Sequence, residues 1–428
     1  MKIVGLITEY NPFHNGHLYH IHESLRITGA DAALVVMSGD YVQRGTPAIM
    51  PKRLRTEMAL YCGAGAVLEL PVCYATGSAE FFALGAISLL DSLGIVDSVC
   101  FGSECSDLPL LQKIAGLLVD EPEQYREILR HELKLGKSFP AARQTAVVFC
   151  TGDPRCADIL KDPNNILGIE YLKALKKCGS SIRPYTIRRK GAGYHSSQLD
   201  GLYSSASAIR SLLAYSSSSI HTEFAGDDST ELSFSDILNE LGNQVPKKCL
   251  ELLSDFHKIQ YPVYQNDFSL ILKYKLLNKH PKSLVRYMDV SPELAARICT
   301  SLNDFFNYKQ FAGLLKTKEL TQTRINRALL HIMLGIKKDS VSEYMNSGYN
   351  FYARLLGFRK GCSQILTEIS KKSSLPLLTK LAESRELCEL GQRMLRDDIL
   401  ASNLYTSVVT DKFKTAFLNE YKQRIIKI

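Results

Sequence analysis

The N-terminal stretch places an apolar run directly before two histidines, and no other feature constrains the fold of the chain as strongly. The run at residues 3–7 is short and rich in β-branched side chains, which is typical of a strand buried on both faces. An Asn-Pro pair ends the run, and a helix should begin near Asn15. His14 and His17 would then lie in its first turn, where free backbone N–H groups and the helix dipole favour an anion. The stretch therefore predicts a phosphate-binding loop between a strand and a helix.

Further apolar runs alternate with helical patterns over the first half of the chain. The predicted additional strands lie at residues 32–37, 66–71, 98–101 and 182–187. This alternation predicts an α/β fold, a Rossmann-like doubly wound parallel sheet, in which ligands bind beyond the carboxyl ends of the strands. A partly charged helical segment near residues 108–160 interrupts the alternation, and we interpret it as an insertion.

Two other segments carry candidate anion-binding groups. Residues 203–210 combine hydroxyl side chains that can cap a helix with Arg210 inside its first turns. Serines cap many helices, so this segment alone is weak evidence for a phosphate site. It supports such a site only together with the histidine pair. The loop after the second strand brings Gln43, Arg44 and Lys52 towards the same edge of the sheet. An exposed basic helix start is the alternative interpretation of that loop.

The string from Glu9 to Leu18, with its strand, Asn-Pro-Phe, His-Asn-Gly-His and helix, resembles the HIGH-type nucleotidyltransferase superfamily related to class I aminoacyl-tRNA synthetases. A lone histidine pair at this spacing is more often a surface or core pair, and the added context is what favours an ATP site. We expect glycine at position 16 because a side chain there would collide with a nucleotide lying over the loop.

The candidate site residues lie in this string and at the ends of predicted elements. The predicted ATP-binding residues are Ile7, Thr8, Glu9, Tyr10, Asn11, Pro12, Phe13, His14, Asn15, Gly16, His17, Leu18, Tyr19, His20, Gly102, Asn165, Arg188, Arg189, Ser204 and Ser205. The predicted catalytic residues are His14, His17, Arg44, Lys52, Ser204 and Arg210, with Gln43 and Arg44 expected to hold a small carboxylate. Mg²⁺ should accompany ATP on phosphate oxygens and water, so no protein metal ligand is predicted.

Charge is divided unevenly along the chain. Residues 1–230 carry 22 Lys and Arg against 24 Asp and Glu, whereas residues 231–428 carry 30 against 20. A basic half points to a polyanion, most commonly nucleic acid, although a solvated basic surface without a partner is the alternative. Candidate phosphate contacts are Lys316, Lys318, Arg324 and Arg327. Aromatic residues are interleaved with the basic residues of 270–382, and periodicity cannot separate core rings from base-stacking rings.

We therefore predict three parts: a nucleotidyltransferase domain at residues 1–215, a polar linker at 216–230, and a mostly helical, basic domain at 231–428 that binds the polyanion, for which the family resemblance described below implies tRNA. In the second half, the apolar residues of segments such as 320–335 and 375–390 show helical spacing, which predicts helices there. The eleven cysteines are scattered and include no Cys-x-x-Cys pair, so most should be buried thiols. No apolar run is long enough for a signal peptide or a membrane span, so we expect a cytoplasmic protein without membrane contact.

With both anion-binding segments and the basic second half, the whole chain resembles the bacterial tRNA(Met) cytidine acetate ligase family. The resemblance implies that acetate attacks ATP to give acetyl-adenylate, and that the acetyl group then passes to N4 of the wobble cytidine, position 34, of elongator tRNA(Met). No stable protein partner is expected. Two alternatives stay open: another adenylyltransferase of the superfamily that acts on a small carboxylic acid or mononucleotide, and a non-catalytic RNA-binding protein that retains a nucleotide fold.

Overall fold

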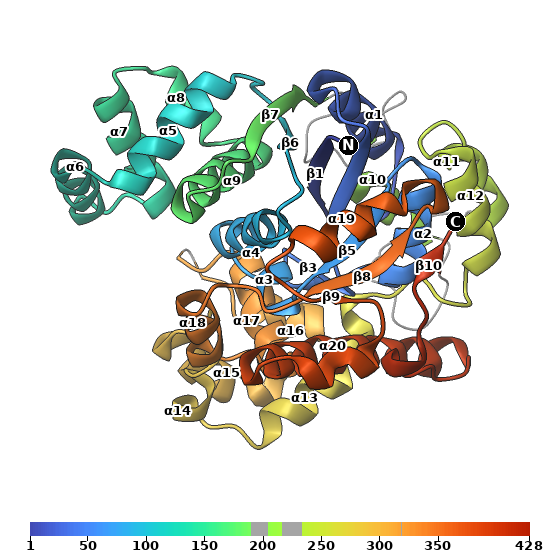
Figure 1. The fold of residues 1–428 in the computed structure, drawn as a ribbon. Helices are drawn as coiled ribbons and strands as arrows, with labels where there is room; N and C mark the ends of the chain where they lie inside the picture. The colour runs from blue at the N-terminus through green and yellow to red at the C-terminus, as the bar shows by residue number, and fades with distance from the viewer. Residues whose placement is uncertain (190–203, 216–232, 318) are drawn as a thin grey trace.

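The computed structural model describes residues 1–189, 204–215, 233–317 and 319–428. The predicted linker at residues 216–230 lies outside these described residues. Figure 1 shows a central sheet with helices on both faces, a group of helices projecting from one side, and further helices below the sheet. The predicted fold class, α/β with a doubly wound sheet followed by a mostly helical second half, is confirmed.

Five parallel strands form the part of the sheet that the sequence predicts. They are β1 (Ile3–Thr8), β2 (Ala32–Ser38), β5 (Ala66–Leu70), β6 (Ser98–Ser103) and β7 (Arg183–Arg188). Their order in the sheet is β5-β2-β1-β6-β7. Along the chain, β2 and β5 are added on one side of β1, and β6 and β7 are then added on its other side. The point of reversal lies between β1 and β6, where open α/β sheets bind their ligands.

Both faces of these strands are covered, which explains their continuous apolar sequences. All seven residues of β2 are buried. Leu34 and Val36 pack into the core beneath α4 (Ala79–Ser92) and α9 (Pro163–Cys178). The alternate residues Val35 and Met37 pack into the core beneath α1 (Asn15–Thr28), α2 (Lys52–Tyr61) and α12 (Lys247–Phe256). The period-two alternation thus divides one strand between two cores.

The second half of the chain also contributes strands, which the sequence analysis did not predict. β8 (Ala353–Phe358) pairs antiparallel with β5, and β9 (Leu377–Leu378) and β10 (Ile426–Lys427) pair parallel with β8. A short apolar run such as Ala-Arg-Leu-Leu-Gly-Phe cannot be told from buried helix by periodicity alone. The sheet therefore draws on both predicted domains, and their division at 215 and 231 stays a proposal.

The helical prediction for residues 375–390 is wrong. β9 and a 3₁₀ turn, η4 (Leu381–Glu386), occupy this segment, and α20 (Glu389–Phe413) begins only at its end. Pro376 lacks the N–H group that a helix interior needs, which outweighs the spacing of the leucines.

A buried ionic cluster joins α2 and β5 to the last part of the chain. The Nζ of Lys52 lies 2.7 Å from Oε1 of Glu69 and 2.8 Å from Oε1 of Glu420. Arg354, on β8, pairs with the same two carboxylates. All four side chains are buried. Since removing one member would leave an uncompensated buried charge, the cluster fixes the second half against the sheet.

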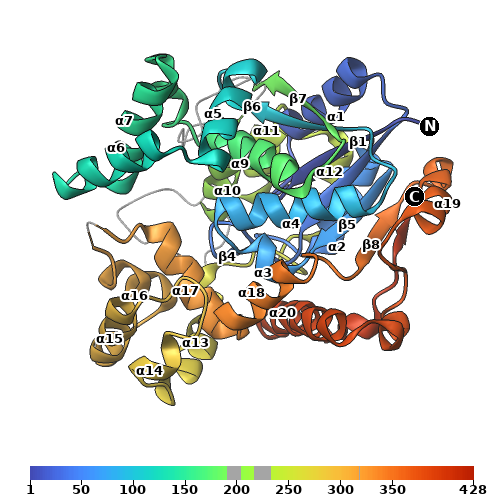
Figure 2. The same cartoon turned by 60° about the vertical axis from the view of Figure 1, so that its left-hand side comes forward.

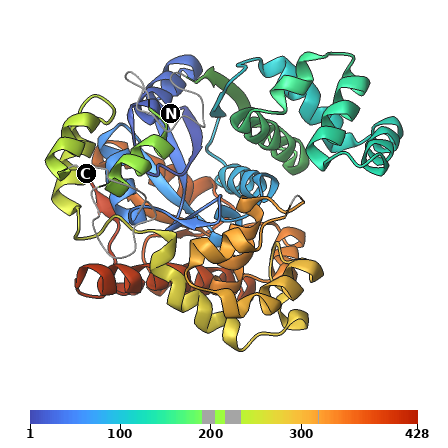
Figure 3. The same cartoon turned by 180° about the vertical axis from the view of Figure 1, so that it is seen from behind.

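The other helices form an insertion and a helical lobe. The predicted insertion contains α5 (Leu108–Asp120), α6 (Glu123–Lys134), α7 (Phe139–Thr151) and α8 (Arg155–Ile159), which project away from the sheet (Figures 1 and 3). The lobe contains α13 (Ser269–Leu277), α14 (Pro281–Leu284), α15 (Pro292–Thr300), α16 (Tyr308–Leu314), α17 (Gln322–Leu334) and α18 (Lys338–Asn346). In Figure 2, α19 (Gln364–Lys372) lies at the opposite end of the molecule from this lobe.

All eleven cysteines are free thiols, and five of them are buried, fewer than expected from the sequence. Within the described ranges, no helix is both long and apolar enough to cross a bilayer.

Candidate functional site

A cavity of about 250 Å³ opens at the carboxyl ends of the central strands. Glu9 follows β1, Gly102 lies at the end of β6, and Ile187 lies at the end of β7. The cavity therefore sits at the point where the strand order reverses, which is the position expected for a nucleotide in an open α/β sheet. Side chains of α1, α4, α9 and α10 (Ala206–Tyr215) complete its wall.

His14 and His17 form the first turn of α1 and face each other across it. His14 is the N-cap residue, and its Nδ1 accepts a hydrogen bond from the backbone N–H of Gly16 at 3.0 Å. Nδ1 of His17 accepts from the backbone N–H of His14 at 3.3 Å. The ring centroids are 3.8 Å apart. Because each Nδ1 is an acceptor, each neutral imidazole carries its proton on Nε2 and can donate it to an anion.

Burial keeps these imidazoles neutral. Burial first, and then the charges of Arg189 and Arg210, lower the pKa of His14 to about 3. Burial also holds the pKa of His17 well below its ordinary value, and that of His20 at about 4. The histidines therefore supply N–H donors rather than positive charge, and the two arginines supply the charge.

The second anion-binding segment lies against the first. The Nη1 of Arg210 donates to the carbonyl oxygen of Asn11 at 2.6 Å, which ties α10 to the loop after β1. The Oγ of Ser205 accepts from the backbone N–H of Ala208 at 3.1 Å and so caps α10. Two helix N-termini, those of α1 and α10, thus converge on one cavity, which favours an anion with several phosphate groups.

Gln244, from the second half of the chain, joins the two segments. Its Oε1 accepts from the backbone N–H of Ser204 at 3.0 Å, and its carbonyl oxygen accepts from the backbone N–H of Asn15 at 2.9 Å. Asn15 also donates from Nδ2 to the carbonyl oxygen of Asn243 at 2.8 Å. Residues 243–244 therefore set the distance between α1 and α10.

A small hairpin covers one side of the cavity. Its strands are β3 (Tyr41–Val42) and β4 (Thr46–Pro47), and Gln43 and Arg44 lie at its tip and line the cavity. The backbone N–H of Gln43 donates to Oε1 of Glu9 at 2.8 Å. Fully buried Arg55 donates to the carbonyl oxygens of Glu9 and Ser38, which lie at the ends of the two strands that carry these loops.

Most predicted site residues line this cavity. Those that do are Ile7, Thr8, Glu9, Tyr10, Asn11, His14, Gly16, His17, Tyr19, His20, Gln43, Arg44, Gly102, Arg189, Ser204, Ser205 and Arg210. Those outside its lining are Pro12, Phe13, Asn15, Leu18, Lys52, Asn165 and Arg188.

The residues outside the lining have other structural roles. Phe13 is buried and backs the ring of His17, with centroids 5.5 Å apart. Asn165 accepts from the backbone N–H groups of residues 104 and 105, while its neighbour Asn164 reaches the cavity. Arg188 is exposed at the end of β7. Lys52 belongs to the buried ionic cluster, so the structure gives it a supporting position instead of the catalytic one expected from the sequence.

The reason expected for Gly16 also changes. A Cβ atom at this position would lie 2.8 Å from Cε1 and 3.0 Å from Nδ1 of His14. The first collision is thus with the capping imidazole, before any ligand is considered.

Sequence reasoning missed part of the wall, which is mostly apolar. The residues concerned are Val42, Thr46, Phe82, Phe101, Asn164, Leu167, Tyr171, Ile187, Ala206 and Ser207. Several of them follow predicted strands or begin predicted helices, so the sequence could have identified them by their position at element ends. The sequence could not show which side chains of a helix such as α9 point into the cavity, because packing sets that direction.

The cavity has little provision for a metal held by protein alone. Among the residues that the structure describes, no group of three or more His, Cys, Asp or Glu side chains is placed to hold a metal ion. Glu9 is the one carboxylate in the described lining of the cavity. This donor set fits a Mg²⁺ ion bound mainly by phosphate oxygens and water.

Comparison with known proteins agrees with this geometry. The sequence pattern described as HIGH Nucleotidyl Transferase matches residues 1–420. The chain belongs to this family. A tRNA(Met) cytidine acetate ligase of Caldanaerobacter subterraneus subsp. tengcongensis is 43% identical over 407 residues, covering 95% of each chain, and one of Acetivibrio thermocellus is 40% identical over 429 residues, covering 100% of each.

Two solved structures are also similar to the chain along its full length. The crystal structure of apo Thermotoga maritima TmcAL (form I) has a TM-score of 0.89 to this chain, with 31% sequence identity and full coverage of both chains. The same protein bound with alpha-thio ATP (Form II) has a TM-score of 0.87, again at 31% identity and full coverage. The similarity to a structure with an ATP analogue covers the full length of both chains and supports ATP binding by this chain.

Proposed function

We propose that this HIGH nucleotidyl transferase is a cytoplasmic, ATP-dependent RNA-modifying ligase. It activates acetate as acetyl-adenylate and transfers the acetyl group to N4 of the wobble cytidine (position 34) of elongator tRNA(Met), giving N4-acetylcytidine. The observation that carries the proposal is the convergence of α1, with His14 and His17, and α10, with Ser205 and Arg210, on one cavity at the reversal point of the sheet. The names of the similar ligases supply the acceptor and the acid.

In the first step, a carboxylate oxygen of acetate attacks the α-phosphorus of ATP. A bond forms between that oxygen and phosphorus, the bond from the α-phosphorus to the bridging oxygen breaks, and pyrophosphate leaves. Negative charge grows on the pyrophosphate, so the main requirements are alignment and charge stabilisation. In this proposal the Nε2–H groups of His14 and His17, together with Arg189 and Arg210, provide both.

We assign the acetate to the hairpin that carries Gln43 and Arg44. Arg44 lines the cavity, and a guanidinium can hold a carboxylate through two hydrogen bonds. The backbone of Gln43 is anchored to Glu9, so the hairpin keeps a fixed position relative to the strand that carries the histidine loop. Mg²⁺, when bound with ATP, would add positive charge at the phosphates, with Glu9 as the nearest protein carboxylate in the lining.

In the second step, N4 of the cytidine attacks the carbonyl carbon of acetyl-adenylate. The new bond is an amide, the bond between the acyl carbon and the phosphate oxygen breaks, AMP leaves, and N4 loses one proton. AMP is a good leaving group, so the step depends on placing the base against the adenylate. Exclusion of water matters equally, because water would hydrolyse the same anhydride.

The basic second half is the proposed tRNA-binding part. Of the aromatic residues interleaved with its basic residues, Tyr287, Phe305, Tyr308, Tyr344 and Tyr352 are buried, which favours the core interpretation for them. Tyr274 and Phe306 are exposed and stay candidates for base stacking. Among the candidate phosphate contacts, Arg327 is paired with Asp289, whereas Lys316 and Arg324 are exposed. Lys318 lies outside the described residues.

The decisive experiment measures pyrophosphate release from ATP with and without acetate, followed by mass spectrometry of the nucleosides from tRNA(Met). Acetate-dependent release together with N4-acetylcytidine is the expected result. Release that depends on a mononucleotide or on another acid would assign the chain to a different adenylyltransferase activity. RNA binding without any ATP consumption would instead indicate a non-catalytic RNA-binding protein.

The acetate assignment has its own test. Arg44→Ala should raise the KM for acetate at least tenfold while leaving the affinity for ATP within about threefold, because Arg44 is assigned to the acid. The matched control is Arg26→Ala, which removes an exposed arginine paired with Glu23 on α1. Wild-type acetate dependence in Arg44→Ala would remove the hairpin from the mechanism.

A further inference from the structure

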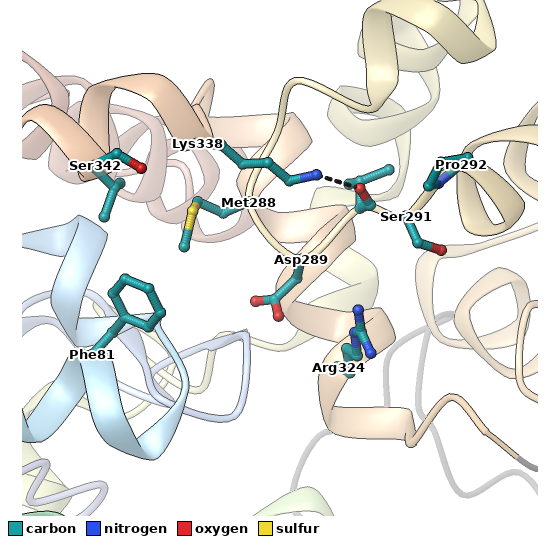
Figure 4. Close-up of a pocket in the computed structure, with 10 residues that line it drawn as sticks. Phe81, Met288, Asp289, Ser291, Pro292, Arg324, Lys338 and Ser342 are labelled. Atoms are coloured by element: carbon teal, nitrogen blue, oxygen red, sulfur yellow. Dashed lines mark hydrogen bonds between the residues drawn. The ribbon is translucent and has the colours of Figure 1, made fainter. Parts of the chain in front are cut away.

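A second cavity, of about 490 Å³, is lined by residues of α4, α17 and α18 (Figure 4). Its size is within the range of about 300–1,000 Å³ that is usual for small-molecule sites. We call it the α17 cleft. Its lining is Phe81 of α4, the turn at residues 288–292, Arg324 of α17, and Lys338, Val341 and Ser342 of α18. Phe81 is the neighbour of Phe82, which lines the nucleotide cavity, so one turn of α4 serves both.

The hairpin of the nucleotide cavity also rests on α17. Gly45, at the tip of the hairpin, has a φ angle of 75°, and a Cβ atom there would collide with the backbone nitrogen of Arg327. Arg324 lies one helical turn before Arg327 on the same helix. The α17 cleft and the nucleotide cavity therefore share two rigid supports, α4 and α17.

The charge balance of the α17 cleft is positive. Asp289, its one carboxylate, is neutralised by Arg327, whose Nε and Nη2 donate at 2.8 Å and 3.1 Å. Lys338 donates from Nζ to the carbonyl oxygen of Val290 at 2.8 Å, and Arg324 is exposed. Among the described residues, neither forms an ion pair within 4.0 Å, so both can contact an external anion. Glu293, Glu319 and Arg297 line the adjoining hollow together with Arg324.

The rest of the wall is apolar. The half-buried ring of Phe81 and the side chain of Met288 lie on one side of the cleft (Figure 4), and Val341 and Pro292 also line it. Apolar side chains beside two cations match the chemistry of a nucleotide, which presents a π-face on one side and a phosphate on the other. A free anion would use the cations and leave the apolar wall exposed.

We propose that the α17 cleft binds one nucleotide of the RNA substrate other than the target cytidine. Its base packs on Phe81 and Met288, and its phosphate contacts Arg324 and Lys338. The inference rests on the proposed function, because it takes RNA as the acceptor. Holding a second nucleotide on the helix that supports the hairpin would fix the RNA relative to the adenylate.

The test uses the full chain and a transcript of tRNA(Met), with dissociation constants measured by filter binding between 50 and 200 mM salt. The double variant Arg324→Gln/Lys338→Gln should weaken binding at least tenfold and reduce the log–log salt slope by about 0.7–0.9, the value for one lost phosphate contact. Phe81→Leu, which keeps apolar volume without a ring, should weaken binding at least fivefold, the lower end of the effect of base–aromatic stacking. Acetate-dependent pyrophosphate release should stay within twofold in both variants.

The control is Lys371→Gln, which removes one exposed positive charge on α19 at the far end of the molecule (Figure 2). If the cleft variants weaken RNA binding no more than Lys371→Gln does, the proposal is wrong. Loss of pyrophosphate release with unchanged RNA affinity would also refute it, and the cleft would then serve only to support the hairpin. If the wild-type chain shows no acetate-dependent release, the proposed function fails, while the RNA affinities of the variants still decide the role of the cleft.

Discussion

Gly16→Ala should separate the stability of α1 from the chemistry of its first turn. The added methyl group would lie 2.8 Å from Cε1 of the His14 ring, closer than real Cβ contacts, and 3.0 Å from its Nδ1. The ring must move, which breaks the 3.0 Å cap from Gly16 and the 3.8 Å approach to His17. Loss of the cap costs about 0.5–2 kcal/mol, and replacing glycine by alanine in a helix returns about 0.5–1 kcal/mol. The free energy of unfolding should therefore change by no more than about 1.5 kcal/mol.

The adenylation rate should change far more. A displaced imidazole no longer points its Nε2–H at the phosphates, and removing one such preorganised donor costs about 10²-fold in related chemistry. We expect kcat for acetate-dependent pyrophosphate release to fall 10- to 100-fold, about 1.4–2.8 kcal/mol.

The matched control is Gly116→Ala in the middle of α5, where a Cβ atom meets nothing within 4 Å. It should increase the free energy of unfolding by about 0.5–1 kcal/mol and leave the rate unchanged. A Gly16→Ala enzyme with wild-type kcat would refute the assignment of the His14 ring to the reaction.

Three further predictions concern the supports of the site. Burial and nearby arginines lower the pKa of His14 to about 3, so below pH 6.5 the unfolded chain binds a proton that the folded chain excludes. The free energy of unfolding should therefore decrease by about 1.4 kcal/mol for each pH unit as the pH falls from 6.5 to 3. His14→Asn, which keeps a capping side chain, should reduce the loss of melting temperature on going from pH 7 to pH 5. Gln244→Ala removes the acceptor of the Ser204 N–H and should raise the KM for ATP at least fivefold, whereas Gln244→Glu should not; equal effects of the two would contradict the positioning role. Lys52→Met should lower the free energy of unfolding by about 3–5 kcal/mol in denaturant titrations, with the rate per folded molecule unchanged; a lost rate in folded protein would restore its catalytic assignment.

The sequence was sufficient for the first strand, the loop and the histidine pair because these are local patterns. The run at residues 3–7, an Asn-Pro break and the His14–His17 spacing each follow from rules that act within a few residues. The position of Arg210 was inferred only through its partner segment, and the structure brings it to the carbonyl oxygen of Asn11.

Other parts of the site depend on contacts between distant residues, which no local pattern records. Gln244 is polar and lies in an unremarkable turn, yet it bridges α1 and α10. Lys52 stands in a basic stretch beside the predicted site, but the carboxylates of Glu69 and Glu420 hold it in the interior, where Arg354 pairs with the same two groups. The charge of a lysine is visible in the sequence, and the carboxylates that will neutralise it are not.

The placement of β8 beside β5 has a consequence for synthesis of the protein. The nucleotide cavity is built from early residues, but the sheet behind it is complete only when residues 353–358 and 426–427 have left the ribosome. Until then, the emerging chain carries β5 with one unpaired edge and Glu69 without its partner Arg354. Unpaired edges bind other strands readily, so the edge of β5 is open to pairing with other chains until β8 has been made.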